Sequence, residues 1–247
     1  MQFQTLWWRY VIVAVCAYLV GNFNSAITIS KLKHKDIREM GSGNPGTMNM
    51  SRNFGLKIGL LVFALDVLKG ILPTLVAGIV FSFFKSDFKG QPIVEFARLV
   101  AAFFAVLGHV FPAFYKFKGG KGIATTIGAL FVCEWYFILI FGACAIAYIF
   151  VTKMGAMGSF IATAPTAIFA SIRLYYDYYV PALSLGIDNT CFILCNVFLL
   201  AIISLTWIAH RENIKRLLWG EEHDTNWLQM IKDAKLKSKY KKQKVDK

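Results

Sequence analysis

The sequence has few acidic residues and nothing that looks like a set of metal ligands. It contains 14 Asp and Glu residues against 27 Lys and Arg residues, and no cluster of aspartates of the kind that binds Mg²⁺. Its 5 cysteines lie in apolar segments without the spacing of zinc ligands, so we expect free thiols that pack as small hydrophobic groups. The sequence therefore predicts a protein without a metal site or a cofactor.

A nucleotide-binding loop is missing as well. The Gly-rich segment at 119–122 contains Lys121, but Gly122 follows this lysine where a P-loop needs Ser or Thr. A nucleotide triphosphatase is therefore not expected.

Long apolar segments make up most of the chain. Hydrophobic residues account for 57% of the 247 residues, and the mean hydropathy is +0.53. Because about 20 apolar residues cross a hydrocarbon core of about 30 Å, these segments predict an all-α integral membrane protein with about seven transmembrane helices. The expected segments are Tyr10–Ile29, Ile58–Phe84, Val94–Phe114, Ile123–Glu134, Trp135–Val151, Met157–Ile172 and Thr190–Ala209.

Glu134 and the basic residues set the expected topology. Glu134 divides an apolar stretch that is too long for one span and short for two, so we predict a short helix that turns back at this residue. Short cytoplasmic loops are enriched in Lys and Arg, and basic residues gather after the first span, after the third span and beyond the last one. Seven segments with the N-terminus outside and the C-terminus cytoplasmic place all of them on the cytoplasmic side.

Two regions follow from this pattern: a polytopic membrane domain at 1–222 and a basic cytoplasmic tail at 223–247. The net charge of +13 is typical of nucleic-acid-binding proteins, but here the basic residues flank the spans or lie in the tail. Attraction to anionic lipid headgroups, worth about 1 kcal/mol for each residue near the surface, explains them. We therefore expect the lipid bilayer, and not nucleic acid, as the partner. A solvated and partly disordered segment is the alternative for 235–247.

The most informative segment places Gly119, Gly120, Lys121 and Gly122 just before a new apolar helix. Glycine has no Cβ, so successive backbone N–H groups can converge on one anion, and a helix that begins near Ile123 adds its positive N-terminal end. Lys121 adds a full positive charge at the same place. This pattern predicts a phosphate-binding site at the edge of the membrane.

A second polar segment, at 41–52, has the sequence GSGNPGTMNMSR. Asn44 precedes a proline, which suits the N-cap of a helix. In that helix Asn49 and Arg52 are three residues apart and share a face. We expect these side chains and Ser42 to contact a ligand. An amphipathic interfacial helix with a polar cap is the alternative.

A third polar segment, at 209–222, leaves the last span and ends on Glu222. Within it His210 and Asn213 are three residues apart and share a helical face at the membrane surface. Neither residue is needed to anchor a helix, which favours a functional role. A basic helix end of no special function would have a similar sequence.

Three ionisable residues lie inside predicted spans. Asp66 and Lys69 are three residues apart in the second span, and His109 lies deep in the third. Charged side chains in a membrane are costly unless they are paired or face the protein interior, so these residues are candidates for a functional site. A structural ion pair, and a histidine bonded to a neighbouring helix, are the alternatives.

Together these segments resemble the bacterial acyl-phosphate:glycerol-3-phosphate acyltransferases of the PlsY type. The resemblance covers most of the chain and keeps the order of three motifs: GSGNPG…N…R at 41–52, GHxFP…FKGGKGIAT at 108–125, and HRENIKRL…GEE at 210–222. Ala156 stands where relatives often carry serine, and Ser159 is the expected substitute.

The resemblance implies transfer of a fatty acyl group from acyl phosphate to the 1-hydroxyl of glycerol 3-phosphate, the first step of phospholipid synthesis. The expected place is the cytoplasmic side of the bacterial plasma membrane. The chain lacks the His-x4-Asp pattern in which the histidine of acyl-CoA-dependent acyltransferases takes the hydroxyl proton. The resemblance therefore implies that the donor phosphate itself takes this proton.

The implied roles fall into three groups. The residues expected to act on the reacting groups are Ser42, Lys121, His210 and Asn213. Those expected to bind substrate or phosphate are Asn44, Gly46, Asn49, Arg52, Gly119, Gly120, Gly122 and Ser159. Those expected to support the site are Asp66, Lys69, His109 and Glu222.

Two other classes remain as rivals. A transporter for an organic phosphate anion shares the basic rim, but it needs polar residues along a path through the bilayer, and the outer halves of these spans are almost wholly apolar. A phosphatidyl-alcohol phosphotransferase needs clustered aspartates for metal binding, which the sequence lacks.

Overall fold

The computed structural model describes residues 3–84, 91–221, 229 and 231–232, and this part of the chain is a bundle of helices without a strand. Glu222 and almost all of the predicted tail at 223–247 lie outside the described residues. Within these described ranges, six helical segments are long and apolar enough to cross a membrane. They are Trp7–Leu32, Leu56–Ser82, Ile93–Tyr115, Ile123–Thr152, Gly155–Leu185 and Thr190–Ala209.

The first apolar segment is two helices, α1 (Trp7–Asn22) and α2 (Ser25–Leu32), and not the single helix predicted at Tyr10–Ile29. The chain leaves the helix at Phe23, and the side chain of Asn24 accepts a hydrogen bond from the backbone N–H of Ile27 at 3.0 Å. An asparagine in this position caps a new helix. The prediction was wrong because hydropathy does not register a cap inside an apolar run.

Helix α5 (Ile93–Val110) lies at the centre of the bundle, where it packs between α1 and α4 (Leu56–Ser82). The inward face of α5 is rich in alanine, and these small side chains permit close helix packing. A Cβ on Gly21 of α1 would overlap the backbone of Ala105, and a Cβ on Gly108 would overlap the backbone of α1. Small residues on both helices therefore let the two backbones touch.

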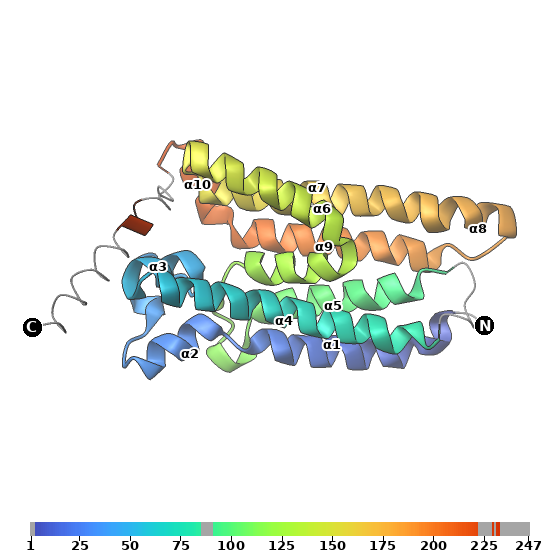
Figure 1. Cartoon of the computed structure of the whole chain (residues 1–247). Helices are drawn as coiled ribbons and strands as arrows, with labels where there is room; N and C mark the ends of the chain where they lie inside the picture. The colour runs from blue at the N-terminus through green and yellow to red at the C-terminus, as the bar shows by residue number, and fades with distance from the viewer. Residues whose placement is uncertain (1–2, 85–90, 222–228, 230, 233–247) are drawn as a thin grey trace, which may run out of the picture.

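Helix α6 (Ile123–Thr152) breaks at Glu134, where φ is −146° and ψ is 54°. Figure 1 shows its first part running into the bundle and its second part returning to the same end. The predicted break at Glu134 is confirmed. The carboxylate is buried and accepts hydrogen bonds from Arg173 of α7 (Gly155–Leu174), the shortest of them at 2.6 Å from Nη2. This ion pair satisfies the charge at the point where the helix turns.

The segment after Arg173 was predicted to be a connection, but it continues as helix. A π-helical turn at Tyr175–Tyr179 links α7 to α8 (Val180–Leu185). The proline of α8 lies in its first turn, directly after the π-helical turn. The bundle therefore extends further at this end than hydropathy indicated.

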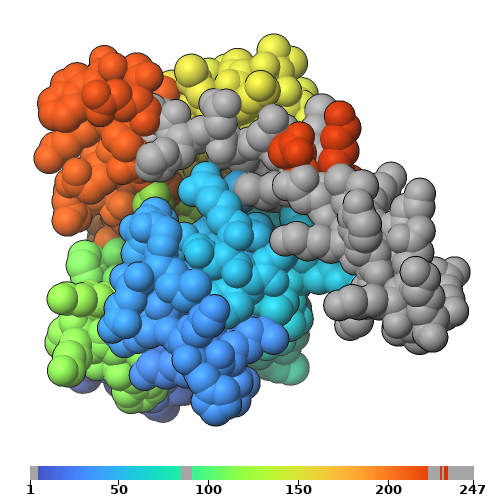
Figure 2. Space-filling view, turned by 90° about the vertical axis from the view of Figure 1, so that its left-hand side faces the viewer, coloured from blue at the N-terminus to red at the C-terminus, as the bar shows by residue number. Residues whose placement is uncertain are grey.

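The polar segments gather at the end of the bundle opposite the start of α1 (Figure 1). This end carries α2, α3 (Thr47–Phe54), the loop at 111–122 and α10 (Arg211–Leu218), which follows α9 (Thr190–Ala209). Figure 2 shows it face on, with α2 in blue, α3 in cyan and α10 in orange. Three segments that lie far apart in the sequence therefore share one end of the molecule.

The ion pair at the break of α6 gives a test of stability. We expect Glu134→Gln to cost about 1.5–3 kcal/mol, because it removes the buried charge from the pair while Arg173, which is half-buried, keeps its contact with Asp177. Asp177→Asn is a matched control, since Asp177 also bonds Arg173, at 3.0 Å, but is exposed. An exposed pair is worth about 0–1 kcal/mol. Thermal unfolding of the purified variants measures both effects, and equal losses would contradict the assigned role of Glu134.

Candidate active site

Lys121, His210 and Asn213 come together at the polar end of the bundle. Lys121 precedes α6, and its ammonium group donates a hydrogen bond to the side-chain oxygen of Asn213 in the first turns of α10. His210 and Asn213 are 4% and 7% exposed, although both lie at the edge of the bundle. The structure thus brings together three of the four residues predicted to act on the reacting groups.

The hydrogen bonds of His210 define what its imidazole can do. Nδ1 lies 2.8 Å from the carbonyl oxygen of Thr206, which can only accept, so Nδ1 carries the proton and Nε2 keeps a lone pair. Burial, together with the charge of Lys121, lowers the pKa of His210 to about 4. The ring is therefore neutral at pH 7. Phe160 of α7 packs edge-on against it at 5.4 Å between centroids, which brings the segment of Ser159 close to the site.

The glycine loop at 119–122 differs from the phosphate-binding site that its sequence predicted. The N–H groups of Gly119 and Gly120 donate to the carbonyl oxygens of Val110 and His109, each at 3.2 Å. These carbonyls lie at the end of α5, where the helix itself supplies no donors. The two N–H groups therefore complete α5. Of the groups predicted to bind phosphate, Lys121 and the start of α6 keep that role. Gly122, at the start of α6, has a φ of +82°.

Close packing explains why glycine occupies these positions. A Cβ at Gly120 would overlap Nε2 of His109 and would lie 3.1 Å from the carbonyl oxygen of Pro45. A Cβ at Gly119 would lie 2.6 Å from Cδ of Pro112. The distance from Gly119 to Pro112 is shorter than side chains tolerate, and the distance from Gly120 to Pro45 is tight. The glycines let the loop lie against α5 and against the 41–46 segment at once.

The 41–52 segment begins its helix later than predicted. Helix α3 starts at Thr47 with Gly46 at the N-cap, so Asn44 is not the cap. Asn44 and Gly46 are half-buried in the turn before the helix, and Ser42 is exposed. The structure therefore places three of the predicted ligand contacts in the loop, and not on the helix.

Asn49 and Arg52 of α3 do not have similar surroundings. The Asn49 amide nitrogen donates to the carbonyl oxygen of Met40 at 2.9 Å, and its oxygen accepts from the backbone N–H of Ser42 at 3.2 Å. Asn49 is buried and holds the loop, whereas Arg52 is exposed at the surface. Of the two, only Arg52 presents its side chain to an incoming ligand.

Asp66, Lys69 and His109 form a buried polar hub below the glycine loop. Lys69 and Asp66 form an ion pair at 2.9 Å, and Nδ1 of His109 lies 3.9 Å from the same carboxylate oxygen. Lys69 also donates to the carbonyl oxygen of Phe23 at 2.9 Å, and Ser25 donates to Asp66 at 2.7 Å. The hub thus links the break between α1 and α2 to the histidine under Gly120.

Sequence reasoning missed several residues that support the site. The spacing of four residues between Thr206 and His210 is compatible with the observed helix contact, and the pair Asn24-Ser25 has the composition of a cap. Nothing in the sequence around Phe160 marks it as a neighbour of His210, because this contact joins segments 50 residues apart.

Comparison with known proteins places these observations in a family. Residues 11–220 match the family model described as glycerol-3-phosphate acyltransferase. The chain is 35% identical over 233 residues to a protein of Mycoplasma mobile named glycerol-3-phosphate acyltransferase, an alignment that covers 90% of this chain and 94% of that one.

Two solved structures are similar to this one. Both are described as PlsY (YgiH), an integral membrane glycerol 3-phosphate acyltransferase, one in the glycerol 3-phosphate form with a TM-score of 0.71 and one in the lysophosphatidic acid form with a TM-score of 0.68. Each is 30% identical to this chain and covers 90% of it, and the match spans 98% of the solved chain.

The packing of Gly120 on His109 leads to a stability prediction. We expect Gly120→Ala to destabilise the protein by about 1–3 kcal/mol, because the new methyl group displaces a buried imidazole. Gly142→Ala is the control, since a Cβ at Gly142 meets no atom within 4 Å. Thermal unfolding measures both. If His109 is the cause, Gly120→Ala and His109→Ala should couple in a double-mutant cycle, and additive losses would refute it.

Proposed function

We propose that this chain, which belongs to the glycerol-3-phosphate acyltransferase family, transfers a fatty acyl group from acyl phosphate to the 1-hydroxyl of glycerol 3-phosphate. The products are lysophosphatidate and inorganic phosphate, and the reaction is the first step of phospholipid synthesis. The observation that carries the proposal is the contact of Lys121 with Asn213 beside a neutral His210.

The reaction needs a cation beside the donor phosphate. The bond between the acyl carbon and the phosphate oxygen breaks as the glycerol oxygen attacks the same carbon, so negative charge grows on the leaving phosphate. Lys121 supplies the positive charge for this group, and the adjacent start of α6 adds to it. Asn213 holds the ammonium group in place.

His210 orients the acceptor and is a poor proton acceptor in the ground state. Its pKa of about 4 makes the imidazole a weak base, whereas the leaving phosphate becomes more basic as the bond breaks. The hydroxyl proton therefore passes to the departing phosphate, and Nε2 of His210 accepts a hydrogen bond from the other free hydroxyl of glycerol 3-phosphate, which aligns the acceptor. Atoms and charge balance without a cofactor.

The second phosphate, that of glycerol 3-phosphate, needs its own contacts. Arg52 is the exposed cation of the 41–52 segment, and Ser42, Asn44 and Gly46 lie in the turn before α3. We assign substrate binding to these residues and to Ser159. Asn49 keeps the segment in shape through its hydrogen bonds, and Gly119, Gly120 and Gly122 let the neighbouring loop approach it.

We also propose that the polar end of the bundle faces the cytoplasm of a bacterial cell, with the N-terminus outside. The excess of Lys and Arg at this end supports the orientation. We count the two parts of α6 on either side of Glu134 as separate segments, which makes seven in the part of the chain that the structure describes, and α1 begins at the end opposite α10 (Figure 1). The membrane domain at 1–222 then ends on the cytoplasmic side, followed by the basic tail.

The donor preference tests the reaction directly. Purified protein with palmitoyl phosphate and glycerol 3-phosphate should release phosphate and form lysophosphatidate. Palmitoyl-CoA should give little product, and EDTA should leave the rate unchanged. Equal rates with palmitoyl-CoA, or a loss of activity in EDTA that magnesium restores, would refute the proposed chemistry.

Lys121→Ala tests the cation. Loss of one partly buried charge-assisted contact to the reacting phosphate is worth about 2–4 kcal/mol, or about thirty- to a thousandfold in kcat/KM. Lys33→Ala removes an exposed lysine from the same end and should change kcat/KM less than twofold. Wild-type kcat/KM in a folded Lys121→Ala variant would exclude the assigned role.

His210→Ala should lower kcat more than it raises KM, and an effect on KM alone would leave His210 a binding group.

Single cysteines introduced into a chain without its native cysteines test the orientation. A cysteine at position 116 should react with an impermeant reagent only after the cells are opened. A cysteine at position 177 should react in intact cells. Labelling of position 116 from outside would overturn the proposed topology.

A further inference from the structure

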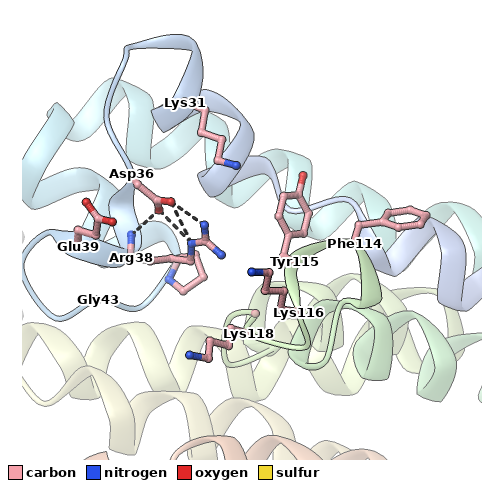
Figure 3. Close-up of a pocket in the computed structure, with 11 residues that line it drawn as sticks. Lys31, Asp36, Arg38, Glu39, Gly43, Phe114, Tyr115, Lys116 and Lys118 are labelled. Atoms are coloured by element: carbon pink, nitrogen blue, oxygen red, sulfur yellow. Dashed lines mark hydrogen bonds and ion pairs between the residues drawn. The ribbon is translucent and has the colours of Figure 1, made fainter.

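A pocket of about 510 Å³ opens beside the candidate active site, between the end of α2 with the following loop and the segment at 114–119 (Figure 3). None of Lys121, His210 and Asn213 lines it. Its wall includes Pro45 and Gly119, which belong to the two loops that border the site. The pocket is therefore adjacent to the candidate active site but has its own side chains.

The charge of this pocket is positive. Asp36 is fully engaged by Arg38, with Nη2 to Oδ2 at 2.6 Å and Nε to Oδ1 at 3.0 Å, and these bonds hold the pKa of Asp36 at about 2. This pair is neutral as a unit. What remains is a set of three lysines facing a single carboxylate, namely Lys31, Lys116 and Lys118 with Glu39.

The lysines reach the pocket from two directions. Figure 3 shows Lys31 above it on α2 and Lys116 across from it on the loop, with Arg38 between them. Lys116 and Phe117 are consecutive non-glycine residues in the left-handed region, with φ of 57° and 58°. This conformation is costly for L-residues and is concentrated at functional sites. The loop therefore adopts a strained backbone conformation at the residues that place Lys116 in the wall of the pocket.

The rim of the pocket suits the boundary between headgroups and acyl chains. Phe114 lines the pocket and is 70% exposed, while Phe117 and Leu32, each next in sequence to a lysine that lines the pocket, are 61% and 75% exposed. Aromatic and aliphatic side chains at such positions lie in the membrane interface, next to phosphate groups. A ligand in the pocket therefore meets lysines, and exposed apolar side chains follow those lysines in the chain.

We propose that this pocket is a second phosphate-binding site, which takes the phosphomonoester headgroup of an anionic lipid while the acyl chains stay in the bilayer. A phosphomonoester carries the negative charge that the lysines lack, and it fits a pocket of this size. The apolar rim favours a lipid over a soluble phosphate as the source. The proposal concerns binding alone and does not depend on the acyltransfer reaction.

Binding of short-chain lipids to the full-length protein tests the proposal. The background is Lys121→Ala, which weakens the candidate active site as a competing phosphate site. The probes are dihexanoyl phosphatidic acid, dihexanoyl phosphatidylcholine and inorganic phosphate, and bound ligand is measured by isothermal titration in a neutral detergent. Lys116→Gln with Lys118→Gln removes two pocket lysines. Lys33→Gln with Lys57→Gln removes two exposed lysines that do not line the pocket.

We expect phosphatidic acid to bind about tenfold or more weakly to the pocket variant and within twofold of the parent to the control variant. Thermal unfolding of each variant confirms that it is folded. An unchanged affinity in the pocket variant, or equal binding of phosphatidylcholine, would overturn the proposal. If inorganic phosphate binds as tightly as phosphatidic acid and is lost in the same variant, the phosphate site stands and the lipid source is refuted.

Discussion

The buried ion pair between Asp66 and Lys69 is the interaction on which the polar end of the molecule depends. Isolated charges inside a bundle of apolar helices are costly, so each needs partners. Lys69 finds one in the carbonyl oxygen of Phe23, where α1 ends, and Asp66 finds one in Ser25, where α2 begins. The pair thereby stabilises the break between α1 and α2.

The same hub supports the second loop of the site from below. His109 lies beside the Asp66 carboxylate and directly under Gly120, whose backbone N–H completes α5. Because Gly120 has no side chain, the loop approaches both His109 and Pro45 and delivers Lys121 to the far side, toward Asn213. The position of the cation is thus set by packing at glycine and by polar groups buried beneath it.

A second ion pair, between Glu134 and Arg173, stabilises the turn inside α6. Glu134 is satisfied by Arg173, so the helix can turn inside the bundle and return to the end from which it came. This keeps both ends of α6 with the polar segments and allows α7 to place Phe160 against His210. Two ion pairs in different parts of the bundle therefore bring one site together from segments far apart in the chain.

Local chemistry was sufficient to predict the long apolar segments and the break at Glu134, because hydropathy depends on neighbours in sequence. His210 and Asn213 were expected on one helical face, but His210 lies at the junction between α9 and α10, and only Asn213 is helical. Hydrogen-bond partners do not depend on neighbours in sequence alone. Gly119 and Gly120 were expected to offer N–H groups to an anion, yet these groups donate to carbonyl oxygens at the end of α5. The amide of Asn49 was expected to bind substrate, yet it forms hydrogen bonds with its own loop. Only the tertiary structure decided these roles, because every buried donor must be paired with whichever acceptor the packing brings near it.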